Sequence, residues 1–214
     1  MGLDMNARVR GFYNWRPLHL AAAAGQYAAV QHLIEQGADI FNTADGGLTA
    51  LHVAAFMGHT TIVTTLLSHI PDAGTEKRFL MAQTGGSMET ALHLAAASHY
   101  CSDALLNALC TRGERVYWTG LANLQGERPI HRAAASQHPE ALKWFLSVVK
   151  QWNLDEEDRF GRTPLWHAAA VGSVDGVRRL ARAGASVNHA DMYGRTPLHI
   201  AVCEGHEDVV TCLL

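Results

Sequence analysis

Hydrophobic residues recur along most of the chain with the spacing of an amphipathic helix. Six stretches place apolar side chains at positions i, i+3 and i+4 or close to it, and they run over residues 30–34, 62–67, 105–109, 142–146, 177–180 and 209–214. This spacing gathers the apolar side chains on one face of a helix. The pattern therefore predicts six short helices, each with one buried face.

A second, more uniform segment precedes each of these stretches. It begins at residues 16, 49, 90, 128, 163 and 196, and it reads RPLHLAA, TALHVAA, TALHLAA, RPIHRAA, TPLWHAA and TPLHIAV. Thr or Arg before the first helical residue is interpreted as a cap, and Pro suits the first turn, where its missing N–H has no partner to lose. A glycine that would end this first helix follows in four of the six units: Gly25, Gly58, Gly172 and Gly205.

The six segments make the chain a repeat protein. Their shared position is occupied by His19, His52, His93, His131, Trp166 and His199, with gaps of 33, 41, 38, 35 and 33 residues. This pattern resembles the ankyrin repeat, which has a period of 33 and the signature Thr-Pro-Leu-His-x-Ala. The resemblance implies an all-α solenoid of about six helix-turn-helix repeats joined by hairpin-like loops, in which each repeat buries its apolar face against its neighbours.

We expect one domain over residues 1–214. Its repeats would cover residues 11–43, 44–84, 85–122, 123–157, 158–190 and 191–214, the last of them incomplete. About eight extra residues follow the second repeat within 68–88, and about five follow the third within 111–125. The third and fourth repeats carry His99 and Gln137 in place of the turn glycine, so the centre should be the least regular part. Because the sixth repeat stops within its second helix, we expect either a fragment or an imperfect capping repeat.

Thirteen histidines raise the question of a metal or catalytic site. The ankyrin resemblance assigns a structural role to the five at the shared position, and it also favours histidine seven residues further on, at His59, His138 and His206. The remaining histidines lack the tight ligand spacing of a zinc site. We therefore expect no metal and no cofactor. Trp166 replaces the structural histidine, and it either fills extra space beside the irregular fourth repeat, which we favour, or is partly exposed and contributes to binding.

Charge and motif content exclude several functions. With 17 Lys and Arg against 20 Asp and Glu, the chain lacks the basic surface that nucleic acids require. No apolar run approaches the ~20 residues of a membrane-spanning helix, and residues 1–10 hold no apolar stretch like that of a signal peptide. No nucleophile elbow, phosphate-binding loop or zinc-protease helix is present, and the four acids at 155–158 are interpreted as a solvated turn. Four cysteines without a Cys-x-x-Cys pair suit a reducing compartment, so we expect an intracellular, cytoplasmic protein that is not an enzyme.

The resemblance also implies where a partner binds. Ankyrin-like proteins generally use the loop tips and the concave face of the first helices, which lie eight to four residues before the shared position and four to five after it. In the first two repeats these positions give Phe12, Tyr13, Trp15, Leu48, Phe56 and Met57. In the last two they give Arg159, Phe160, Arg162, Met192, Tyr193 and Arg195. Aromatic, Met and Arg side chains are the types enriched at binding hot spots. The first three residues could instead cap the open end of the first repeat.

The expected function is therefore a non-catalytic module, an adaptor or scaffold, that recognises another protein. The arginines at the later tips favour a partner that combines acidic and apolar groups. An alternative is the targeting domain of a larger enzyme or secreted effector whose chemistry lies outside this sequence. A third possibility is an enzyme that uses the insert at 68–88. No feature of the sequence bears on the oligomeric state.

Overall fold

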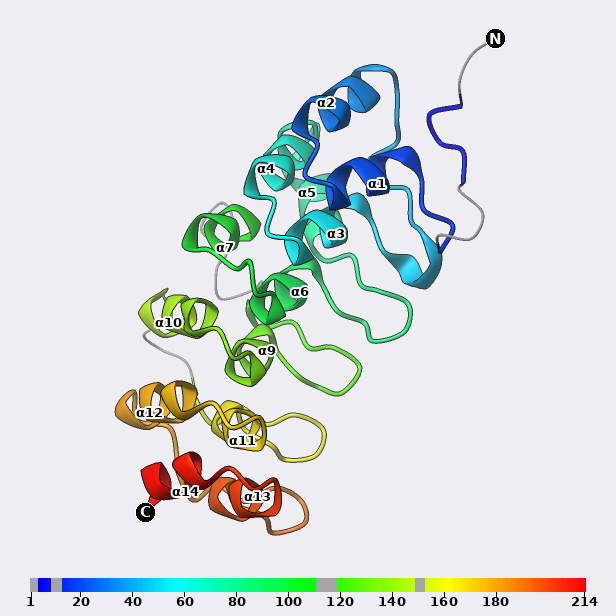
Figure 1. The fold of residues 1–214 in the computed structure, drawn as a ribbon. Coiled ribbons are helices and arrows are strands. Elements are labelled where there is room, and N and C mark those ends of the chain that lie inside the picture. Colours follow the sequence, from blue (N-terminus) through cyan, green and yellow to red (C-terminus); the bar gives the residue numbers. More distant parts are fainter. Residues whose placement is uncertain (1–3, 9–12, 111–118, 149–152) are drawn as a thin grey trace.

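Pairs of short helices stack into one curved row. The computed structural model describes residues 4–8, 13–110, 119–148 and 153–214. In Figure 1 the first pair lies at the upper end of the row and the last pair at the lower end. Each described helix pair falls within one of the predicted repeats, although the boundaries between repeats remain a prediction. The all-α solenoid expected from the sequence is confirmed.

The motif segments form the inner helices of the row. They are α1 (Pro17–Ala23), α3 (Ala50–Phe56), α6 (Ala91–Ala97), α9 (Pro129–Ala135), α11 (Pro164–Ala170) and α13 (Pro197–Cys203). Consecutive inner helices pack against one another along the whole row. Alanines such as Ala22, Ala55 and Ala96 are fully buried between them, and their small side chains allow this close approach.

The amphipathic stretches form the outer helices, which lie on one side of the inner row (Figure 1). They are α2 (Tyr27–Glu35), α4 (Thr60–Ser68), α7 (Asp103–Leu109), α10 (Pro139–Val148), α12 (Val174–Arg182) and α14 (Glu207–Leu213). Their apolar faces bury side chains including Leu66, Leu105, Leu142 and Leu180. Buried residues from Leu18 to Val209 form one continuous hydrophobic core, so each repeat depends on its neighbours for burial.

Histidine is part of the cap of most inner helices. In α3 the Thr49 hydroxyl lies 2.8 Å from Nδ1 of His52 and accepts a bond from the His52 N–H. The sequence interpretation of arginine as a capping residue needs correction, because its side chain has no acceptor. At Arg128 the backbone N–H instead donates to Nδ1 of His131, at 3.0 Å.

The turn after the inner helix differs between repeats. Gly25, Gly58, Gly172 and Gly205 all adopt the positive φ angles that favour glycine, as their position predicts. In the third and fourth repeats the helix ends instead at Ser98 and Ser136, which are extended, with ψ of 141° at both. The centre of the row is therefore irregular where the sequence predicted it.

The insert after the second repeat contains an additional helix, α5 (Ala73–Leu80). The Asp72 carboxylate caps it by accepting a bond of 2.9 Å from the Thr75 N–H. Phe79 and Leu80 belong to the main core, so α5 is packed on the solenoid. Most of the insert after the third repeat, with Tyr117 and Trp118, lies outside the described residues. No helix in the described ranges is both long and apolar enough to cross a membrane.

Candidate partner-binding surface

The loops between repeats project from the inner helices on the side away from the outer helices (Figure 1). Backbone hydrogen bonds connect each loop tip to the next, with N···O distances between 2.6 and 2.9 Å. Their donor and acceptor residues are Asp45 and Tyr13, Gly85 and Gly46, Leu124 and Ser87, Arg159 and Gln125, and Met192 and Phe160. The tips therefore form one continuous strip along the protein.

Buried aspartates shape the tips of the fifth and sixth repeats. The Asp158 carboxylate accepts bonds from the backbone N–H of Phe160 at 2.8 Å and of Arg162 at 3.0 Å, and from the Arg162 Nε at 2.7 Å. Asp191 makes the same three bonds to Tyr193 and Arg195. Each aspartate thus fixes both the backbone of its tip and the direction of its arginine.

Electrostatics reinforce the arrangement around Asp158. Burial alone would raise its pKa, but hydrogen bonds from His167, from the Arg162 side chain and from backbone N–H groups outweigh burial. The pKa of the Asp158 carboxyl is therefore held well below its ordinary value. The group stays charged, and it keeps Arg162 and His167 in place, the latter through a contact of 3.0 Å to Nε2.

Rings and guanidinium groups alternate across the last two tips. The Arg162 guanidinium carbon lies 4.7 Å from the centre of the Phe160 ring and 5.2 Å from that of Trp166. The Arg195 guanidinium carbon lies 5.5 Å from the Trp166 ring and 5.2 Å from the Tyr193 ring. These are cation–π distances. We call the five side chains Phe160, Arg162, Trp166, Arg195 and Tyr193 the Arg–aromatic row.

The row is buried at its centre and exposed at its ends. Trp166 is only 6% exposed, whereas Phe160 is 38% and Tyr193 67% exposed. Neighbouring Met192 is 62% exposed. The structure thus brings five of the six predicted tip residues of these repeats to one place, and Arg159, also exposed, lies directly before Phe160.

Trp166 has the packing role that the sequence favoured. At the equivalent position His131 Nε2 donates to the Glu156 carbonyl at 2.9 Å, and His19, His52 and His93 make the same kind of bond to the loop that leads to the next inner helix. The indole Nε1 of Trp166 is buried and has no hydrogen-bond partner among the described residues. His199, in the last described repeat, bonds through Nδ1 to Thr196 and is exposed.

The predicted residues of the first two repeats are more dispersed. Tyr13 and Phe56 are exposed, whereas Trp15, Leu48 and Met57 are half-buried. Phe12 lies outside the described residues. The third and fourth repeats separate this group from the Arg–aromatic row (Figure 1). Whether Tyr13 and Trp15 bind a partner or cap the first repeat remains a prediction.

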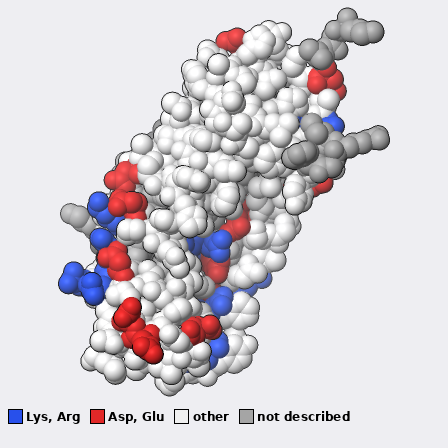
Figure 2. Space-filling view, viewed as in Figure 1, with Lys and Arg blue, Asp and Glu red and all other residues white. Residues whose placement is uncertain are grey.

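Sequence reasoning missed an ionic network between these two groups. Arg132 Nε lies 3.1 Å from Glu89, and Glu127 lies 3.9 Å from both Arg132 and Arg162. Figure 2 shows basic and acidic atoms side by side in the middle of the molecule and few charges over its upper half. A repeated pattern could have revealed the lower part of the network, because residues 158–162 read DRFGR and residues 191–195 read DMYGR.

The acidic turn at 155–158 is not simply solvated, which corrects that interpretation. Asp158 is buried. Glu156 contacts Arg128 at 2.8 Å, and Asp155 accepts a 2.8 Å bond from the Ser186 N–H. The turn therefore joins consecutive repeats.

Ligand atoms of Glu127, Asp158 and His167 lie within 4.8 Å of one another, which is close enough for a shared metal ion. The Arg162 Nη2, however, is 2.7 Å from the Asp158 carboxylate. A guanidinium thus already supplies the positive charge that the two carboxylates attract, and a metal ion would have to displace it. This arrangement fits an internal ion network better than a metal centre.

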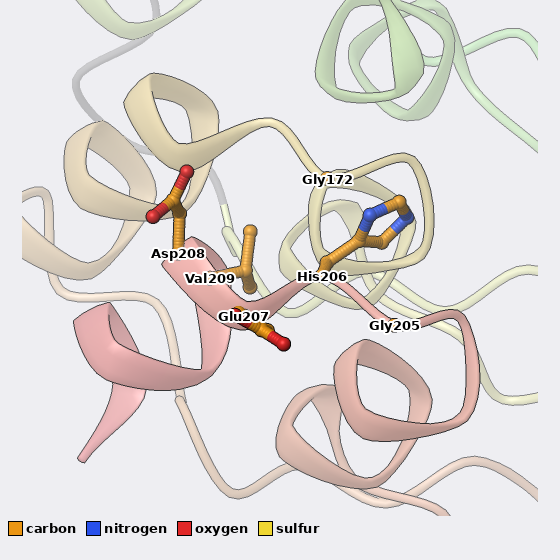
Figure 3. A pocket seen from close by; sticks show the side chains of 6 residues that line it. All are labelled: Gly172, Gly205, His206, Glu207, Asp208 and Val209. Atoms are coloured by element: carbon orange, nitrogen blue, oxygen red, sulfur yellow. The ribbon is translucent and has the colours of Figure 1, made fainter.

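Hollows in the described part of the molecule lie between the last two repeats and beside α5. A hollow of about 290 Å³ lies between the last two repeats, where His206 stands over the turn at Gly172 (Figure 3). Its Nε2 donates to the Ala170 carbonyl at 3.1 Å, so the imidazole is part of the scaffold. A second hollow of about 450 Å³ lies between Phe41 and α5. Three threonines, Arg78 and Phe79 are among the residues that line it.

Comparison with known proteins identifies the family. The family model described as ankyrin repeats (3 copies) matches residues 2–79 and 130–214. The chain belongs to the ankyrin-repeat family. Among solved structures, the human ASB11 ankyrin repeat domain aligns with a TM-score of 0.74 at 29% identity, over 93% of this chain and 82% of that one. The ankyrin-repeat fold is a protein–protein interaction module and is generally non-catalytic.

Curated relatives are much longer proteins. Human Rabankyrin-5 is 31% identical over 80% of this chain, and the ankyrin repeat protein nuc-2 of Neurospora crassa is 27% identical over 88%. The glycerophosphocholine phosphodiesterase GDE1 of Candida albicans is 28% identical over 94%. The chain spans between 14% and 20% of the length of these relatives.

Proposed function

We propose that this ankyrin-repeat chain recognises a partner protein through the tips of its fifth and sixth repeats, with the Arg–aromatic row at the centre of the contact. The observation that carries the proposal is the alternation of rings and guanidinium groups over the buried Trp166. Phe160, Met192 and Tyr193 offer large exposed side chains on a tip strip whose backbone is already hydrogen-bonded. Rigid aromatic and arginine side chains of this kind dominate binding energies.

Charge supports a partner that carries acidic groups beside apolar ones. Arg162 and Arg195 are neutralised by Asp158 and Asp191, but exposed Arg159 has no carboxylate within ion-pair distance among the described residues. A carboxylate next to an apolar side chain on the partner would meet Arg159 and Phe160 together. We expect binding to weaken with added salt, because such a surface pair is screened.

A second candidate function is the targeting domain of a longer enzyme. It is supported by the Candida relative, which is named as a phosphodiesterase and which this chain matches over only 17% of its length. Recognition would then direct the chemistry of another segment. We also propose a cytoplasmic location, because Cys101, Cys110, Cys203 and Cys212 are all free thiols.

The test is quantitative affinity purification with the wild-type chain and two variants. The double variant Phe160→Ala/Tyr193→Ala removes the exposed ends of the row, and Tyr27→Ala removes an exposed ring from outer helix α2 as a matched control. We expect a partner retained by wild type and by Tyr27→Ala, with affinity lowered about 30-fold or more in the double variant, since one hot spot contributes about 2 kcal/mol. Equal capture by all three chains would refute the proposal.

A further inference from the structure

At most junctions between repeats a side-chain donor bonds to a backbone carbonyl at the end of the inner helix. His59 Nε2 donates to the Ala23 carbonyl at 3.2 Å, and His206 Nε2 donates to the Ala170 carbonyl at 3.1 Å. Between the second and third repeats the Ser98 hydroxyl does the same for the Phe56 carbonyl, at 2.5 Å. These three carbonyls occupy the same position, four residues after the shared motif position.

The junction between the third and fourth repeats departs from this rule. His138 has the same repeat position as His59 and His206, yet its Nε2 faces Nδ1 of His99 in place of a carbonyl. The missing turn glycine explains the difference, because the chain leaves α6 through an extended Ser98 and places an imidazole beside the next repeat. The two rings are nearly perpendicular, at 77°, with centroids 4.2 Å apart.

This pair lies at the surface, outside the proposed binding site. His99 is exposed and His138 half-buried. Two imidazole nitrogens that face each other offer ligands that zinc and copper ions prefer.

We propose that His99 and His138 form a binding site for a divalent transition-metal ion of the zinc and copper class, coordinated by Nδ1 of His99 and Nε2 of His138. In the metal-free pair one of these nitrogens carries the hydrogen and the other accepts it. On metal binding the donor ring changes tautomer, so that both nitrogens present a lone pair and no net proton is released.

The two rings must move apart to hold an ion. Two imidazole nitrogens at tetrahedral zinc lie about 3.3 Å apart, given Zn–N bonds of about 2.0–2.1 Å, which is farther apart than the facing nitrogens of His99 and His138. Water completes the coordination.

Binding would join the third and fourth repeats. The two ligands come from the turns that precede α7 and α10, so a bound ion adds a connection at the least regular junction of the solenoid. By linkage, an ion that binds only the folded chain raises the unfolding temperature with increasing concentration.

The experiment is calorimetric titration of the tag-free full chain with Zn²⁺ and, separately, with Cu²⁺. We expect about one equivalent in the wild type and at least a tenfold weaker association after His99→Ala or His138→Ala. The control variant is His32→Ala, which removes an exposed histidine from α2 and should leave binding unchanged. Circular dichroism of the metal-free variants checks that each is folded.

A spectroscopic readout distinguishes this site from scattered surface binding. The electron paramagnetic resonance spectrum of the Cu²⁺-loaded chain should show coupling to two imidazole nitrogens, and this coupling should disappear in either variant. Zn²⁺ should raise the unfolding temperature of the wild type but not of His99→Ala/His138→Ala. The proposal fails if the double variant binds either ion as tightly as the wild type does.

Discussion

The guanidinium carbon of Arg195 lies 5.5 Å from the centre of the Trp166 ring, across the junction between the fifth and sixth repeats. Earlier repeats place a histidine where Trp166 stands, and its imidazole bonds to a carbonyl in the loop that leads to the next inner helix. Here a ring held between two guanidinium groups takes over that role. The substitution therefore exchanges a directional hydrogen bond for packing and cation–π contact.

Trp166→Ala should lower the free energy of unfolding by about 3–5 kcal/mol, because it leaves a cavity in the core and removes the shared ring. Trp166→His should lower it less, since an imidazole keeps part of the packing and regains a donor for the next repeat. Urea unfolding followed by far-ultraviolet circular dichroism measures both. If Trp166→Ala and Trp166→His lose the same free energy of unfolding, an imidazole cannot take the place of the indole ring at this junction.

Stability should depend on pH through the buried histidines. Burial lowers the pKa of His52, His93 and His131 to about 4, from 6.5, although hydrogen bonds to backbone carbonyls partly oppose this. Between pH 6.5 and 4 the unfolded chain binds more protons than the folded chain does. Stability should therefore be greatest above about pH 6.5 and fall as the pH is lowered to 4, by about 3 kcal/mol for each histidine at most.

The variant His93→Gln tests this origin. It should lower stability at pH 7.5, because the bonds to Thr90 and Glu127 are lost, and it should also flatten the decline between pH 6.5 and 4. His32→Gln, at an exposed position, should leave both the stability and its pH dependence as they are. If His93→Gln leaves the decline of stability between pH 6.5 and 4 unchanged, groups other than His93 cause the acid sensitivity.

Two glycines with the same φ angle allow the cost of backbone strain to be measured apart from the cost of a steric contact. Gly172 and Gly205 both have φ of +75°, but a methyl group at Gly172 would lie 2.7 Å from Nδ1 of His206, whereas one at Gly205 meets nothing within 4 Å. Gly205→Ala should cost about 1 kcal/mol from backbone strain alone. Gly172→Ala should cost more, because the imidazole in Figure 3 must also move. The measurement is the unfolding midpoint of each variant. Equal midpoints for Gly172→Ala and Gly205→Ala would mean that His206 moves aside at no cost.

The inserted helix α5 should be stabilised chiefly by Phe79. This ring is buried and lies in edge contact with Phe41, at 5.0 Å between centroids, while Phe41 itself is exposed. Phe79→Ala should lower the free energy of unfolding by about 3–4 kcal/mol and open residues 68–88 to proteolysis. Phe41→Ala should change stability by much less and leave the cleavage pattern unaltered, which limited proteolysis with mass spectrometry can show.

The repeat architecture was predictable because its information is local. A motif such as TPLHIAV and a glycine six residues after its histidine specify one helix and its end, and six copies specify the stack. The insert after the second repeat lacks such repetition. Its length was predicted, but the helix α5 depends on the capping Asp72 and on burial of Phe79, which only the assembled solenoid provides.

The candidate site was predictable only in part. The repeat register placed Phe160 and Tyr193 at the tips because that position follows from counting residues. The buried aspartates that accept hydrogen bonds from these tips were not predicted. Asp158 was grouped with three neighbouring acids, and its burial depends on the adjacent repeat. The contact of His99 with His138 joins residues 39 apart, and it arises from a turn that deviates from the repeat, so counting along the sequence does not predict it.

The hydrogen bonds that connect successive loop tips have a kinetic consequence. Loops that must become ordered on binding lose about 1–2 kcal/mol of conformational freedom for each residue, and they slow association while they rearrange. Here the N–H of Met192 is already bonded to the Phe160 carbonyl, and every earlier tip is joined to its neighbour in the same way. A partner would therefore meet a preformed surface, and we expect the rate of complex formation to be set by collision and charge, with affinity differences expressed mainly in the rate of dissociation.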